Sequence, residues 1–287
     1  EPMMTTTRVE TIPPISRSEA NALAVAEYRR LVDQLRSLTP DDWTQPTSCP
    51  PWDVRAMAGH SVGMLSDFTS LQSVMRRMRA ATKAAKRSGG PTIDAMTAMQ
   101  VADHAELTTA ELIERAEFNA PRAAHWRATA PSPLRRVPIT EYVDRQPETW
   151  RIGYLLDIVL TRDPWIHRVD IAHATGHQME LTAGHDGRLI ADVVAEWARR
   201  HGQPFTLTLD GPAGGHFTAG NGTGDHIDLD AVEFCRALSG RSPRQRPARP
   251  PGPVLTPLLD AAAGGLRARS GAGAGGHDDR SVAAHGA

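Results

Sequence analysis

Cysteine, net charge and long apolar runs are all scarce in this sequence, and each shortage excludes a class of protein. Only Cys49 and Cys235 occur among 287 residues, outside any CxxC pattern, which excludes a disulfide framework and a zinc ribbon. The 32 basic side chains balance 33 acidic ones to a net charge of -1, so no global field favours nucleic acid. No run of about 18 apolar residues and no apolar signal-peptide core are present. We therefore expect a cytoplasmic protein, monomer or homodimer, that makes no membrane contact and whose partner is a small molecule.

Apolar residues recur at helical spacing through the first two thirds of the chain. The pattern predicts helices over residues 18–38, 53–87, 93–117 and 148–175, with Asp53 as the N-cap of the second helix. A Pro- and Arg-rich span that looks irregular precedes the last of them. Four long helices with few strand signals predict a helical bundle.

The sequence pattern changes after about residue 181. "GRLIADVVAEWARRHG" has the periodicity of an amphipathic helix, and "PFTLTLDG" alternates apolar and polar residues as a strand does. We predict a mainly α fold class, in which a four-helix bundle is followed by a small α+β C-terminal domain. The predicted division is a flexible N-terminus (1–17), the bundle (18–178), the α+β domain (179–242) and a disordered Pro/Gly-rich tail (243–287).

His60 is the first candidate for chemistry. It lies about two turns into the predicted second helix, where Ala56, Met57, Gly63 and Met64 share its face and make that face apolar. A face of this kind points into a bundle. A lone histidine there is more often a core residue than a metal ligand, so His60 alone does not decide between the two.

Asp163 and His167 form a second candidate pair, four positions apart. On a continuous helix this spacing lets a carboxylate and an imidazole converge on one cation. Pro164 favours the alternative, in which Asp163 is an N-cap and the proline occupies the first helical position. The preceding "GYLLDIVLT" looks helical, so we expect one helix bent at Pro164. Asp170 is close enough to support His167, although a surface acid is the more common outcome.

Two segments together resemble a known family. "WTQPTSCPPWDVRAMAGH" is similar to the segment that leads to a helical histidine in the mycothiol-dependent maleylpyruvate isomerases, part of the wider group of DinB-like metalloproteins. "TRDPWIHRVDIAHATG" is similar to that family's acid-x3-His segment. The resemblance covers roughly residues 18–241. It implies a DinB-like bundle with a C-terminal domain related to the sterol carrier proteins.

The resemblance also implies a site. It assigns a divalent metal, usually zinc, to His60, Asp163 and His167, and mycothiol or a similar low-molecular-weight thiol as cosubstrate. It also implies a catalytic role for Arg241, which would meet a substrate carboxylate, although a structural arginine at the end of a helix is an equal alternative. The departures from the family pattern include Asp163 where glutamate is common and Pro51 where glycine is usual.

These observations lead to three functional hypotheses. The preferred one is a metal-dependent isomerase or thiol transferase that acts on a small electrophile. The others are a non-catalytic metal-binding or regulatory module of the same fold and a metal-assisted hydrolase.

Overall fold

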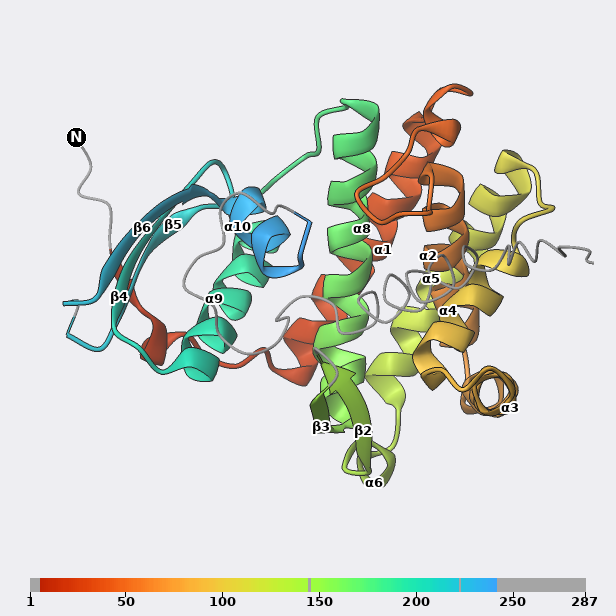
Figure 1. The fold of residues 1–287 in the computed structure, drawn as a ribbon, viewed down its shortest axis with the longest axis horizontal. Coiled ribbons are helices and arrows are strands. Elements are labelled where there is room, and N and C mark those ends of the chain that lie inside the picture. Colours follow the sequence, from red (N-terminus) through yellow and green to blue (C-terminus); the bar gives the residue numbers. More distant parts are fainter. Residues whose placement is uncertain (1–5, 144–145, 222, 242–287) are drawn as a thin grey trace, which may run out of the picture.

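Four long helices form a bundle in the computed structural model, which describes residues 6–143, 146–221 and 223–241. They are α1 (Arg17–Ser37), α2 (Val54–Asp67), α5 (Thr109–Thr129) and α8 (Leu160–Thr175). Helices α1 and α2 each pack against both α5 and α8, and the bundle occupies the right side of Figure 1. The mainly α fold class is confirmed. Within the described ranges, no helix has the length and apolar character needed to cross a membrane.

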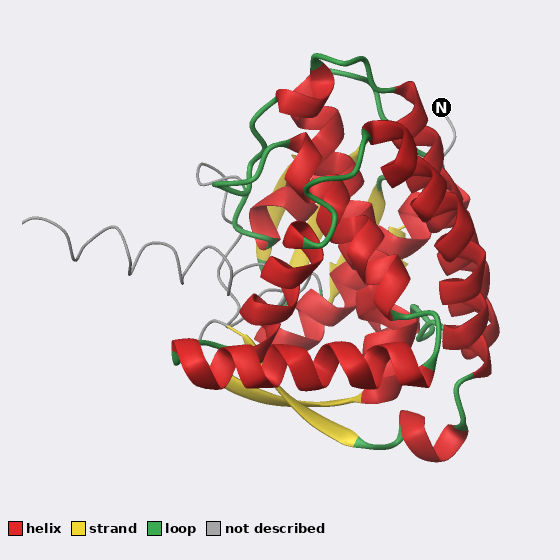
Figure 2. Ribbon diagram, turned by 90° about the vertical axis from the view of Figure 1, so that its right-hand side faces the viewer, coloured by secondary structure: helices red, strands yellow, loops and turns green. Residues whose placement is uncertain are grey.

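Two of the expected helices are each divided in two. Helix α3 (Leu71–Ser88) begins after α2 because the Ser70 hydroxyl accepts a hydrogen bond from the Ser73 N–H at 3.1 Å. Helix α4 (Thr92–Ala102) ends before α5, which begins at a capping box between Thr108 and Glu111. The apolar periodicity runs through both breaks, so the predicted boundaries were wrong there. In Figure 2, the long helix α3 crosses one end of the bundle.

The span between α5 and α8, expected to be irregular, contains a hairpin. A short helix α6 (Ser132–Arg135) leads to the antiparallel strands β2 (Pro138–Val143) and β3 (Gln146–Arg151). Ile139 of β2 lies opposite Trp150 of β3, and both belong to an apolar cluster with Ile93 and Met96 of α4. The hairpin therefore packs at the end of the bundle where α4 lies.

The C-terminal part is a small α+β unit, on the left of Figure 1. It contains η4 (Ala183–Gly187), α9 (Arg188–His201), β4 (Phe205–Asp210), β5 (Gly215–Ala219), β6 (Asp225–Asp230) and α10 (Ala231–Leu238). The strand order is β1-β5-β4-β6. Strand β1 (Thr6–Arg8), from the segment expected to be flexible, pairs in parallel with β5 and is followed by η1 (Val9–Thr11). The tail expected to be disordered lies outside the described residues.

Helix α8 contributes to two apolar cores. Trp165, Ile166 and Val169 pack in the core shared with α9 and the sheet. Leu160 and Ile171 pack in the core of the bundle. The division between a bundle ending at residue 178 and a domain beginning at residue 179 stays a prediction, because one helix serves both cores.

Pro164 lies inside α8 and does not start it. The chain is helical from α7 (Ile152–Tyr154) through the π-helical η3 (Leu155–Val159) into α8. Proline has no N–H, so the carbonyl oxygen of Leu160 loses its partner within the helix. The Tyr28 hydroxyl donates to that oxygen at 2.9 Å, and Arg127 Nη1 donates at 3.0 Å. Side chains of α1 and α5 thus replace the missing backbone hydrogen bond.

Replacing Arg127 with methionine is expected to lower the free energy of unfolding by about 2 to 4 kcal/mol, because buried acceptors lose their donor. Arg127 is 3% exposed and also donates to the Leu156 carbonyl at 2.6 Å and to Thr161 Oγ1 at 2.7 Å. Urea unfolding measures the change. The exposed Arg122 on the same helix provides the control, Arg122→Met, which should change stability by less than about 0.5 kcal/mol. Equal losses in the two variants would contradict the assigned role of Arg127.

Candidate metal centre

The segment before α2 aims His60 into the molecule. The Thr47 N–H donates to the Trp52 carbonyl at 3.0 Å, and the Trp52 N–H donates to the Cys49 carbonyl at 2.8 Å, so the chain folds into a tight loop. Asp53 then caps α2 by accepting the Ala56 N–H at 2.8 Å, as expected from the sequence. Two turns later His60 is 2% exposed.

Helix α8 brings the second pair to the same place. Asp163 and His167 are both 0% exposed and lie on the face of α8 that meets His60. Asp163 Oδ2 lies 3.4 Å from His60 Nε2, and Asp163 Oδ1 lies 3.4 Å from His167 Nε2. One donor atom from each of the three residues lies within 4.8 Å of the others. A single cation can therefore contact all three side chains.

The N-cap alternative for Asp163 is wrong. Asp163 lies inside α8, whose N-cap residue is Val159. Pro164 has no N–H to donate to the Leu160 carbonyl, and Arg127 and Tyr28 donate to it instead. The helix therefore does not have to begin at the proline. The Asp163 carboxylate is directed toward the two imidazoles instead.

The three side chains fit a metal ion. Among the described residues, both nitrogens of His60 and of His167 and both oxygens of Asp163 are buried without a hydrogen-bond partner. Buried polar groups are almost always hydrogen-bonded, because leaving one unpaired costs about 1 to 3 kcal/mol. Two imidazoles and a carboxylate form a donor set that divalent metals accept, with positions left for other ligands.

Charge at the site also suits a cation. Burial by itself would raise the pKa of Asp163, but His167 and His60 beside it hold that pKa well below its ordinary value. Burial by itself would lower the pKa of His167, and the Asp163 carboxylate raises it instead. Asp163 therefore carries a negative charge at neutral pH.

A second layer of residues supports His167. Asp170 Oδ2 lies 3.6 Å from His167 Nδ1, on the side of the ring away from Asp163. Arg241 Nε donates to both Asp170 oxygens, at 2.8 and 2.7 Å. Asp170 is 0% exposed, so the expectation of a surface acid was wrong. The ion pair across 71 positions holds the carboxylate in line with the imidazole.

The structure thus places Arg241, the residue given a catalytic role by the resemblance, against Asp170. Arg241 is 9% exposed, and its Nη1 also donates to the Ser239 carbonyl at 3.3 Å. Its catalytic role stays a prediction, and its observed contacts are those of a residue that positions Asp170.

Cys49 and Trp52 complete the surroundings of the two histidines. The Cys49 thiol lies 3.8 Å from Asp170 Oδ2, and burial raises the pKa of this thiol to about 12. The Trp52 ring centroid lies 5.2 Å from that of His60 and 6.4 Å from that of His167. The indole therefore covers both imidazoles, and Cys49 stays a protonated thiol at neutral pH. Trp52 belongs to the motif found in the sequence, but no sequence signal pairs Cys49 with Asp170.

A partly open cavity of about 200 Å³ includes His60 in its wall. The wall is formed by side chains of α2, α3, α4 and the β2–β3 hairpin, together with Trp126 of α5 and the start of α8. Apolar residues predominate, and Glu141 of β2 is a carboxyl among them whose pKa burial raises to about 7. Most of the wall thus comes from α3, from α4 and from the span between α5 and α8.

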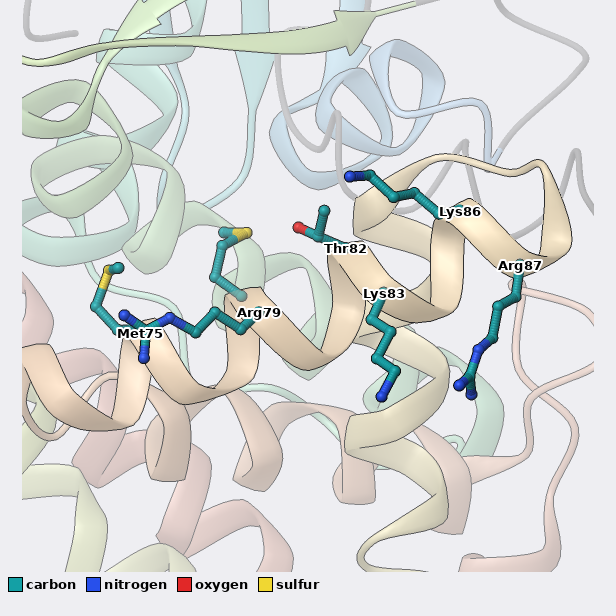
Figure 3. Close-up of a pocket in the computed structure, with 7 residues that line it drawn as sticks. Met75, Arg79, Thr82, Lys83, Lys86 and Arg87 are labelled. Carbon is teal, nitrogen blue, oxygen red and sulfur yellow. The ribbon is translucent and has the colours of Figure 1, made fainter.

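A second, shallow pocket lies on the outer surface of α3 (Figure 3). Its wall includes the cationic residues Arg79, Lys83, Lys86 and Arg87, all of them exposed, and contains none of the three candidate ligands. Basic side chains in the last turns of a helix are favoured by the helix dipole and are most often solvated.

Comparisons with known proteins agree with the geometry. The sequence model of the family described as "Mycothiol maleylpyruvate isomerase N-terminal domain" matches residues 24–172. A crystal structure of a mycothiol-dependent maleylpyruvate isomerase is similar to this chain with a TM-score of 0.52 and 16% identity, covering 86% of this chain and 99% of that one. A histidine-to-alanine mutant of such an enzyme has a TM-score of 0.48 and 17% identity, covering 83% of this chain and 93% of that one. No curated protein sequence matches. At 16% identity, the likeness to the first of these structures shows a shared fold.

Proposed function

The chain belongs to the mycothiol maleylpyruvate isomerase N-terminal domain family, and from this premise we propose that it is a metal-dependent enzyme that uses a low-molecular-weight thiol. The proposed metal is zinc, held by His60, Asp163 and His167. The proposed thiol is mycothiol, and the substrate is a small electrophile. The reaction is an isomerisation or a thiol transfer.

The observation that carries this proposal is the convergence of three buried side chains on one point, where Asp170 is the outer neighbour of His167. The donor atoms of His60, Asp163 and His167 lie within 4.8 Å of one another, and their nitrogen and oxygen atoms make no hydrogen bond within the described ranges. A histidine that served only as a core residue would have its ring nitrogens satisfied. A metal bound here would supply a positive charge that lowers the pKa of a thiol or polarises a carbonyl.

Neither cysteine of the chain is suited to be the nucleophile, and both lie in the part of the chain that the structure describes. The pKa of Cys49 is raised to about 12, so its sulfur is a poor nucleophile at neutral pH. Cys235 is 0% exposed, and burial raises the pKa of its thiol as well. A thiol from solution satisfies the need for a reactive sulfur, which favours a thiol cosubstrate.

Asp163, Asp170 and Trp52 have separate parts in this proposal. Asp163 holds a negative charge beside both imidazoles, and Asp170 orients the His167 ring through its Nδ1. Trp52 covers the histidines and excludes water from one side. Addition of a thiol to a conjugated double bond forms a C–S bond and leaves a single bond free to rotate. Elimination of the thiol then gives an isomer, whereas retention gives a thioether.

Incubation of the zinc-loaded protein with mycothiol and a panel of electrophiles tests this function. We expect isomerised product or thioether to form faster than in protein-free solution, and His167→Ala to lose most of the difference. His173→Ala is the matched control, because His173 is an exposed histidine on the same helix. A rate equal to background across several classes of electrophile would reject the enzyme and favour the binding module.

A further inference from the structure

The chemistry of the cavity beside His60 restricts what the proposed enzyme can accept. The cavity is partly open to solvent, since the exposed Met75 and Met78 line it, and it has a volume of about 200 Å³. Apolar side chains from separate elements form most of its wall, among them Phe68 after α2, Val74 of α3, Met96 of α4 and Leu160 of α8. The residues that line it are all described, and none is lysine or arginine. A carboxylate placed here would find no basic side chain in the wall to pair with, and could meet a positive charge there only at a metal held by His60.

Besides His60, the wall contains the polar side chains of Thr97, Gln100 and Glu141, and none of these three carries a positive charge. Gln100 Nε2 is already engaged, because it donates to Asp67 Oδ2 at 2.8 Å. Asp67 in turn pairs with Arg77 Nε at 2.8 Å, so that charge is neutralised outside the cavity. Glu141 has its pKa raised to about 7 by burial, and at higher pH it would repel an anion.

We propose that this cavity binds the apolar body of a neutral aromatic or alkyl electrophile and holds its reactive carbon toward His60. This inference rests on the proposed function for the reaction, and it names the substrate class. Maleylpyruvate carries two carboxylates, so the wall disfavours that substrate. A dry apolar cavity of about 150 Å³ accepts a benzene molecule, so this volume suits one ring or a chain of about six carbons.

Helix α3 forms the outer wall of the cavity. Met75, labelled in Figure 3, and Met78 line this cavity and also the shallow pocket on the outer surface of α3, so these two methionines separate the two spaces. Both side chains are exposed, at 42% and 36%. Methionine is unbranched and adapts to ligands of different shape. A ligand therefore enters at Met75 and Met78 without unfolding the bundle.

Binding of ethylbenzene, measured by calorimetry on the full-length protein with and without zinc and without thiol, tests the substrate class. We expect saturable 1:1 binding, and a gain of about fourfold in affinity for each methylene added up to the capacity of the cavity. Maleate at equal concentration should bind at least tenfold more weakly. Val74→Trp fills the cavity from α3 and should weaken ethylbenzene binding at least tenfold. Gln72→Trp adds the same ring at an exposed position of α3 outside the wall and should change binding less than twofold.

A second variant, Met96→Gln, keeps the inference testable if Val74→Trp does not fold. Met96→Gln nearly keeps the length of the side chain but makes the wall polar, so it should also weaken ethylbenzene binding while urea unfolding stays cooperative. The proposal is overturned if wild type shows no saturable binding, if Val74→Trp and Met96→Gln bind as wild type does, or if maleate binds more tightly than ethylbenzene.

The reaction itself separates this inference from the proposed function. Thioether formation with a dicarboxylate electrophile, and none with a neutral aryl electrophile, would overturn the inference and support the function. Binding of ethylbenzene to a protein that holds no zinc and forms no thiol product would support the apolar cavity and reject the function.

Discussion

His167→Ala is expected to lower the affinity for Zn²⁺ by more than about a hundredfold. Loss of a residue that only hydrogen-bonds to a metal ligand already lowers metal affinity about tenfold to a hundredfold, and His167 is itself a candidate ligand. His167 is 0% exposed and its Nε2 lies 3.4 Å from Asp163 Oδ1. His60→Ala is expected to have an effect of the same size. Both changes leave two of the three side chains that converge on the site.

Competition with a chelator, followed by metal analysis of the dialysed protein, measures these affinities. Wild type should retain about one zinc per chain, the number that one three-residue site holds. His173→Ala should retain the metal as wild type does, because His173 is exposed on the other side of α8. Urea unfolding of the apo forms separates loss of a ligand from loss of the fold. Equal zinc content in wild type, His60→Ala and His167→Ala would refute the assigned ligands.

Arg241→Met is expected to lower the free energy of unfolding by about 3 to 5 kcal/mol, because it leaves the buried Asp170 carboxylate without its cation. The same change should weaken zinc binding by about tenfold to a hundredfold, because Asp170 orients His167. Arg241 Nε contacts both Asp170 oxygens, and Asp170 Oδ2 lies 3.6 Å from His167 Nδ1. Chelator competition and urea unfolding measure the two effects.

A double variant and a conservative variant make this prediction specific. Asp170→Asn combined with Arg241→Met removes both charges and should regain part of the stability lost in Arg241→Met alone. Arg241→Lys keeps the charge and loses the guanidinium that donates to Asp170. If Arg241 instead contacts a substrate carboxylate, Arg241→Lys will raise KM for an anionic substrate and leave zinc affinity unchanged. Unchanged zinc affinity in Arg241→Met would contradict the positioning role.

The four-helix bundle was predictable because its signals are local. Apolar periodicity and the Asp53 cap are readable from neighbouring residues, and the structure confirms both. The breaks at Ser70 and Thr108 were missed because apolar residues continue on both sides of each cap. The β2–β3 hairpin was missed because Ile139 and Trp150 gain their stability by packing on α4.

The three candidate ligands could be predicted only by combining two separate segments of the sequence. Spacing placed Asp163 and His167 on one helical face, and the resemblance linked them to His60. Sequence could not decide whether Pro164 starts the helix. The answer depends on Tyr28 and Arg127, which lie on α1 and α5 and hydrogen-bond to the Leu160 carbonyl.

The sequence by itself determined the helical class and the two motifs, because each depends on residues close together in the chain, and the family resemblance joined His60 to Asp163 and His167 as candidate ligands. The tertiary structure alone decided that Asp170 and Arg241 form a buried ion pair behind His167, across 71 positions. It alone decided that an apolar cavity adjoins His60. The ion pair and the cavity both depend on which side chains meet when separate helices pack. Burial then sets how much each contact contributes to stability. The tertiary structure also decided where the Asp163 carboxylate points. The helix continues through Pro164 because Tyr28 of α1 and Arg127 of α5 hydrogen-bond to the Leu160 carbonyl.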